Sequence, residues 1–75
     1  MTEIDIMAIA QRHYRRRLND PSVSTLTVAI EARRELEAAI SQAQAQGDNI
    51  DAARVRRLQH ALGEALLAAA GAREG

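Results

Sequence analysis

The sequence lacks several residue types that often carry chemistry. Its 75 residues include no cysteine, tryptophan, phenylalanine or lysine, and only one proline and one tyrosine. Without cysteine the chain can form no disulfide, thiolate zinc site or iron–sulfur cluster, and it has no cysteine nucleophile. With Tyr14 as the only aromatic residue, it lacks the base-stacking platform of single-strand nucleic-acid binders. An aromatic-lined ligand pocket within one subunit is disfavoured for the same reason.

Long apolar runs are also absent. No stretch of about 18 apolar residues is present, so we expect no membrane-spanning helix. The first residues do not combine a charged segment with an apolar one, as a secretory signal does. We therefore expect a cytoplasmic protein with no membrane partner.

The charges balance, because the ten basic residues, all arginine, match ten acidic residues. A neutral chain has no overall electrostatic footprint for nucleic acid. At this length residues 1–75 form one domain at most, and such a domain is only marginally stable alone. The sequence therefore predicts a homo-oligomer, with a dimer as the first expectation.

The first predicted helix covers about residues 3–18. Thr2 is placed to act as its N-cap and Asp5 as the capping-box partner, and the segment contains no glycine or proline. Apolar residues gather on one broad arc of the helical wheel, with arginines opposite. Pro21 ends the helix, because the residue before a proline is pushed out of the α region.

The second and third predicted helices cover about 22–46 and 49–70. The start of the second is open between Pro21 and Leu26, because the β-branched residues there are weak helix formers. Gly47 is a natural residue to follow its C-terminus. Asp48 and Asn49 are expected to cap the third helix, and a polar tail is expected from about residue 71.

Apolar spacing along these two helices predicts an antiparallel hairpin. Steps of three and four residues, typical of a packed helical seam, run from Leu26 to Ala43 and from Val55 to Ala69. The short connection makes the two helices neighbours. The fold class is therefore all-α, with the N-terminal helix packed on the hairpin or swapped onto a partner subunit.

Some residues do not fit this seam and are candidates for an oligomer interface. Arg33 occupies a seam position, where a polar residue often specifies register. The simpler interpretation, which we favour, is that its stem packs on the seam while the guanidinium reaches Glu37. Ile9, Ile30 and Leu67 fall outside the main stripes, although single exposed apolar residues are ordinary. The candidate interface set is Ile9, Tyr14, Ile30, Arg33 and Leu67.

Two arginine clusters are candidates for binding an anion or a partner. The first lies at the end of the first helix and includes Arg12, Arg15 and Arg16, where basic residues also complement the helix dipole without any ligand. The second opens the third helix, where arginines oppose the dipole, which makes it the better candidate. Its members are Arg54, Arg56 and Arg57.

No catalytic constellation is present. His13 and His60 have no second histidine or other metal-ligand frame around them, so we expect no catalytic residue, metal or cofactor. The leading hypothesis is a non-enzymatic interaction or regulatory protein that homo-oligomerises and binds a protein partner through helix faces. The alternative is a nucleic-acid-binding helical dimer that uses the arginines of the first and third helices.

Overall fold

Three α-helices account for most of the chain. A computed structural model describes residues 4–74 and contains α1 (Ile6–Asn19), α2 (Thr25–Ala45) and α3 (Ala52–Glu74), with no strand in that range. The predicted all-α class with three helices is confirmed. The molecule is elongated, with principal extents of 39 × 20 × 18 Å. None of the helices in this range combines the length and apolar character that a bilayer crossing requires.

The first helix begins later than predicted. Ile4 and Asp5 are not helical, and the Asp5 carboxylate accepts a hydrogen bond from the backbone N–H of Ala8 at 3.0 Å. Asp5 is therefore the N-cap of α1, since a capping side chain satisfies one of the free amides of the first turn. The predicted cap Thr2 lies outside the described residues.

A short turn connects α1 to α2. The Asp20 carboxylate accepts hydrogen bonds from the Ser22 hydroxyl at 2.6 Å and from the Ser22 backbone N–H at 3.1 Å. These bonds hold the pKa of Asp20 below its ordinary value of 3.8, because they stabilise the charged form. The Ser24 hydroxyl then accepts from the N–H of Thr27 at 3.0 Å, so α2 starts at Thr25.

Gly47 ends α2 as predicted. Its φ of +98° is in the left-handed region that glycine adopts without strain. The N–H of Gly47 donates to the carbonyl of Gln44 and the N–H of Asp48 donates to that of Ala43, each at 3.0 Å. This pair of bonds is the Schellman motif, which satisfies the last carbonyls of a helix.

The bounds of α3 differ from the prediction at both ends. The Asp51 carboxylate accepts from the Arg54 backbone N–H at 2.8 Å, so Asp51, and not Asp48 or Asn49, caps the helix. At the other end Gly71 does not stop the helix, which continues to Glu74. The six residues 46–51 between α2 and α3 form a longer connection than the sequence predicted.

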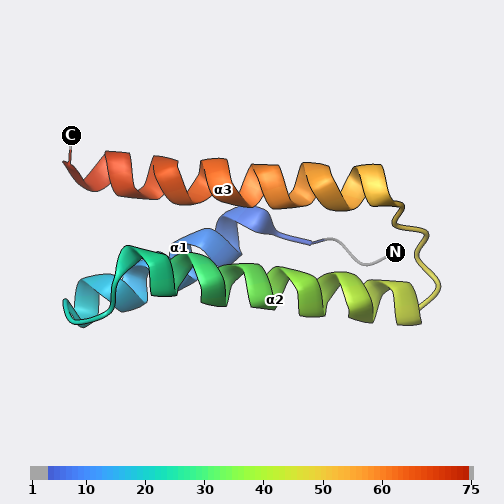
Figure 1. Cartoon of the computed structure of the whole chain (residues 1–75), viewed down its shortest axis with the longest axis horizontal. Helices are drawn as coiled ribbons and strands as arrows, with labels where there is room; N and C mark the ends of the chain where they lie inside the picture. Colours follow the sequence, from blue (N-terminus) through green and yellow to red (C-terminus); the bar gives the residue numbers. More distant parts are fainter. Residues whose placement is uncertain (1–3, 75) are drawn as a thin grey trace.

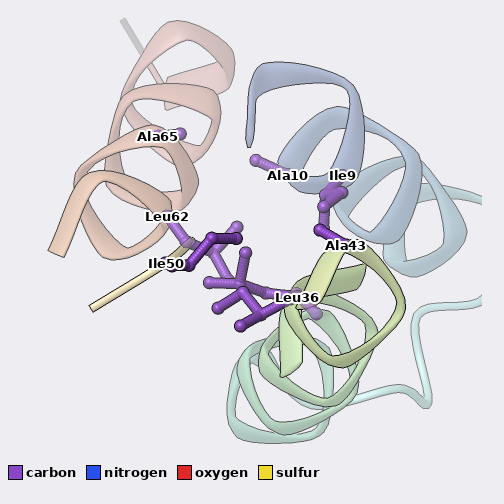
Figure 2. Packing of buried hydrophobic residues seen from close by; sticks show 9 residues of the cluster. Ile9, Ala10, Leu36, Ala43, Ile50, Leu62 and Ala65 are labelled. Atoms are coloured by element: carbon purple, nitrogen blue, oxygen red, sulfur yellow. The ribbon is translucent and has the colours of Figure 1, made fainter. Parts of the chain in front are cut away.

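The helices surround one hydrophobic core. Figure 2 shows side chains from all three helices meeting there, together with Ile50 from the connection before α3. Leu36 of α2 is fully buried in this core. The buried cluster comprises Ile9, Ala10, Ala32, Leu36, Ile40, Ala43, Ile50, Leu62 and Ala65.

The position of α1 determines how the hairpin packs. α2 and α3 run antiparallel along the molecule, and α1 lies obliquely against both within the same chain (Figure 1). Each of the two α1 interfaces is more extensive than the direct packing of α2 on α3. α1 therefore lies partly between α2 and α3. It contributes side chains to the core and limits the direct packing of α2 on α3.

Because α1 packs against α2, the predicted seam is wrong in the first half of α2. Leu36, Ile40 and Ala43 are buried as expected, but Leu26 is 70% exposed and Arg33 is exposed. Val28 and Ala32 are buried instead. The buried stripe of α2 is rotated toward α1, because α1 supplies the apolar surface that the prediction assigned to α3.

The prediction for Ile9 is also wrong. The sequence places Ile9 outside the main apolar stripe and among the candidates for an oligomer interface, but it is buried in the core. α1 packs on both α2 and α3, so its buried arc is wider than that of a helix with one neighbour, and this arc includes Ile9. Tyr14, a second interface candidate on this helix, is also buried.

Candidate interaction groove

An open groove runs between the first half of α2 and the second half of α3, and we call it the α2/α3 groove. Its larger part has a volume of about 530 Å³, and Tyr14 of α1 contributes to its lining. This part is lined by Tyr14, Thr25, Ala29, Gln59, His60, Gly63, Glu64, Leu66, Leu67 and Ala70. A second hollow of about 390 Å³ shares Ala29, Gln59, His60, Gly63 and Leu66 with it and adds Arg33, Arg56 and Leu62.

The groove is hollow at mid-length and has a projecting apolar side chain nearby. Ala29 on α2 and Gly63 on α3 are small and leave the groove hollow at mid-length. A Cβ built on Gly63 would meet nothing within 4 Å, so the fold of the single chain does not require glycine there. Leu67, one turn along α3, is 75% exposed. The surface thus combines a hollow with a projecting apolar side chain.

Exposed apolar side chains continue on α2. Leu26 and Ile30 are 70% and 44% exposed and lie four residues apart on one face of α2, and Leu26 is three residues before Ala29. Exposure of Ile30 and Leu67 was predicted from the helical wheel and is confirmed. Contiguous exposed apolar side chains on a small protein mark an interaction surface more often than isolated ones do.

Charged side chains lie in both parts of the groove. Arg33 Nε lies 3.4 Å from Glu37 Oε1 on α2, and His60 Nε2 lies 3.2 Å from Glu64 Oε1 on α3. The expected partner of Arg33 is therefore confirmed, although Arg33 is on the open flank of α2 and not in a closed seam. Arg56 lines the same hollow as Arg33, whereas Glu64 lines the larger part of the groove with Leu67. The groove thus has basic side chains in one part and an acidic side chain beside the apolar residues of the other.

The arginines at the end of α1 are largely engaged by α2. Arg12 Nη2 lies 2.7 Å from Glu35 Oε2, and His13 Nε2 lies 2.8 Å from Glu35 Oε1. Arg16 forms a further ion pair with Glu31. Arg15 is exposed and forms no ion pair within the described part of the chain. The first predicted anion-binding cluster is thus mostly a ladder that ties α1 to α2.

The arginines of α3 are in a different situation. The side chains of Arg54, Arg56 and Arg57 are exposed, and none of them pairs with a carboxylate among residues 4–71. Arg56 faces the groove, and Arg54 and Arg57 are three residues apart on the helix. Of the two predicted clusters, only this one leaves all its side chains open to a partner.

The structure brings together much of the predicted interface set. Tyr14, Arg33 and Leu67 line the groove. Ile30 is exposed on α2 outside the lining, and Ile9 is buried in the core. The sequence reasoning missed Gly63, although a glycine inside an otherwise regular helix is a signal of close approach that could have found it.

Residues 4–74 contain no group of three or more histidine or acidic side chains able to hold a metal ion. Comparisons with protein-family models, curated proteins and solved structures found no match for this chain. The groove and its surroundings are therefore the features that bear on function.

Proposed function

We propose that the chain is a non-enzymatic interaction module that binds an amphipathic helix in the α2/α3 groove. The observation that carries this proposal is the groove itself, an apolar channel between two helices with Ala29 and Gly63 at mid-length. A helix laid along such a channel buries its apolar face at i, i+3, i+4 and i+7 positions.

The exposed apolar residues beside the channel support this proposal. Leu26, Ile30 and Leu67 together present a large apolar area to water. Burying apolar surface yields about 25 cal/mol for each Å² removed from water, so covering these side chains favours association. None of the three is needed to build the core of the single chain, since all lie outside the buried cluster.

The basic part of the channel supports orientation of the bound helix. Arg33 and Arg56 line it, and each already exposed guanidinium can bond a carboxylate on the incoming helix. A partner helix that is apolar along most of its length and acidic near one end therefore fits the channel in one direction only. Rim charges of this kind contribute more to orientation and specificity than to affinity.

Nucleic-acid binding is less well supported. Arg12 and Arg16 form ion pairs with glutamates of α2, so two of the six arginines proposed for that role are engaged within the chain. The α3 arginines remain open, but the chain as a whole carries no net charge. Binding to a polyanion depends on neutralising several phosphates at once.

The test is selection of peptides against the protein followed by a groove variant. Amphipathic helical peptides are selected from a display library on protein immobilised at low density, and their affinity is measured by fluorescence anisotropy. Ala29→Glu places a charge at mid-groove and should weaken binding by about tenfold or more, because the carboxylate must be desolvated.

Ala38→Glu is the matched control, because it makes the same change on the same helix at an exposed position outside the groove. We expect it to leave the affinity unchanged. If no peptide is recovered, or if every peptide binds the two variants equally well, the groove is not a helix-binding site.

A further inference from the structure

We infer that the occupant of the α2/α3 groove is the same face of a second copy of this chain, so that the protein is a two-fold homodimer with α2 and α3 of both subunits at the interface. This inference rests on the proposed function, because it names the helix-bearing partner of the same groove. In a two-fold interface each subunit contributes the same surface, so that surface must be complementary to itself.

The shape of the groove face meets that requirement. The projecting Leu67 and the hollow at Gly63 lie one turn apart on α3, and the projecting Leu26 and the small Ala29 lie three residues apart on α2. One face therefore carries both the knobs and the holes of a helix–helix contact. Two copies related by a two-fold axis can place leucines of one subunit into the hollow of the other.

The chain exposes more surface than an average monomer of its mass. The accessible surface is 5298 Å². A folded monomer of 8.2 kDa exposes about 4,500 Å². The elongated shape contributes to this excess, and so do the apolar side chains on and beside the groove, which a second copy would cover.

The charges allow two identical faces to meet. Arg33 and Arg56 line one hollow of the groove, whereas Glu64 lines the other, so the groove face carries both signs of charge at different places. The chain has no net charge, so two copies do not repel each other at long range. A face of one sign would favour a partner of the opposite sign, whereas this mixed face can pair with itself.

Gly63 lines the groove and leaves room for a second helix at this position. It lies inside α3, where glycine is a poor helix former, and nothing in the chain would contact a side chain there. Glycine lets the backbone of a second helix approach closely. A second subunit seated at mid-groove gives the glycine a role that the single chain does not.

The test is the mass of the protein in solution, measured by sedimentation equilibrium over a range of concentrations. We expect a reversible monomer–dimer equilibrium for the wild type. Ala29→Glu should raise the dissociation constant by about tenfold or more, because it puts a larger side chain in the hollow and a carboxylate that must be desolvated when the interface forms, and Ala38→Glu should not change it.

A second pair of variants distinguishes loss of the dimer from loss of the fold. Gly63→Gln fills the hollow with a good helix former and should weaken the dimer while helicity by circular dichroism is retained. Gly71→Gln makes the same exchange outside the groove, also at a position with no neighbour within 4 Å, and should leave the dimer intact.

Two results would overturn the inference: a strictly monomeric wild type, or a dimer that neither Ala29→Glu nor Gly63→Gln weakens. The first result still separates the two proposals. If the protein is monomeric but binds selected peptides in a manner sensitive to Ala29→Glu, the occupant is a different helix and the proposed function stands. If peptide binding is also insensitive, both are wrong.

Discussion

Leu36 is the residue on which the core depends most. Among residues 4–71 it is the largest side chain that is fully buried, and it lies among residues from all three helices (Figure 2). Truncating a buried leucine removes transfer free energy and leaves a cavity, at a cost of about 2–5 kcal/mol. We expect Leu36→Ala to lower the free energy of unfolding by that amount, measured by urea denaturation followed by circular dichroism.

Met7→Ala is the control for this prediction, because Met7 is on α1 but about half exposed and outside the groove. Its expected cost is less than about 1 kcal/mol. Equal losses for the two variants would contradict the assignment of the core. A loss of several kcal/mol would leave Leu36→Ala barely folded, since domains of this size are only marginally stable.

Single residues also mark where the sequence was informative. The left-handed conformation of Gly47 was predictable, because a glycine after a regular helical stretch has few other roles. Asp51 and Ser24 were harder to assign, because several residues able to cap a helix stand next to each other at both turns. Which of them caps depends on where the adjacent helix packs.

At the scale of the elements, local spacing was enough to predict which segments are helical. It was not enough to predict which helices pack against each other. The stripes in the second half of α2 and in α3 were correct, because each has the same buried side whichever helix covers it. The stripe in the first half of α2 was wrong because α1 covers Val28 and Ala32. Two sides of α2 are apolar there, and the sequence alone does not show which of them is buried.

The same ambiguity explains how much of the candidate site was predictable. Leu26 and Ala29 were recognised as one stripe, but they were assigned to a closed seam within the chain. In the structure that stripe lines or flanks the open groove. The periodicity thus identified an apolar face of α2 but assigned it the wrong neighbour, because spacing carries no information about which helix, if any, covers that face.

The ion pairs between α1 and α2 yield a prediction for the position of α1. Glu35 is partly buried and pairs with both Arg12 and His13, so Glu35→Gln removes the charge that holds two side chains of α1. Partly exposed pairs contribute up to about 1 kcal/mol. We expect a loss of roughly that size, together with faster hydrogen exchange of α1 amides and a smaller dependence of stability on salt.

Glu37→Gln is the matched control, since Glu37 pairs with Arg33 inside α2 and does not reach α1. It should change stability by about 0.5 kcal/mol or less and leave exchange in α1 unaltered. If Glu35→Gln leaves the exchange rates of α1 unchanged, apolar packing alone positions this helix.

At the scale of the whole molecule, the proposed dimer would make folding depend on association. The single chain leaves Leu26, Ile30 and Leu67 in water, and a second subunit that covers them stabilises the folded state by mass action. For a dimer that unfolds to two chains, a tenfold rise in concentration adds about 0.7 kcal/mol per chain. That increment raises the Tm of a domain of this size by roughly 3–5 °C.

We therefore expect the Tm of the wild type to rise by that amount for each tenfold increase in concentration, measured by thermal denaturation followed by circular dichroism. The Tm of Ala29→Glu should be nearly independent of concentration, because its folded state is monomeric. That of Ala38→Glu should follow the wild type. A Tm that does not change with concentration in any of the three proteins would mean that α1, α2 and α3 of one chain supply all the stability, and that the groove contributes none of it.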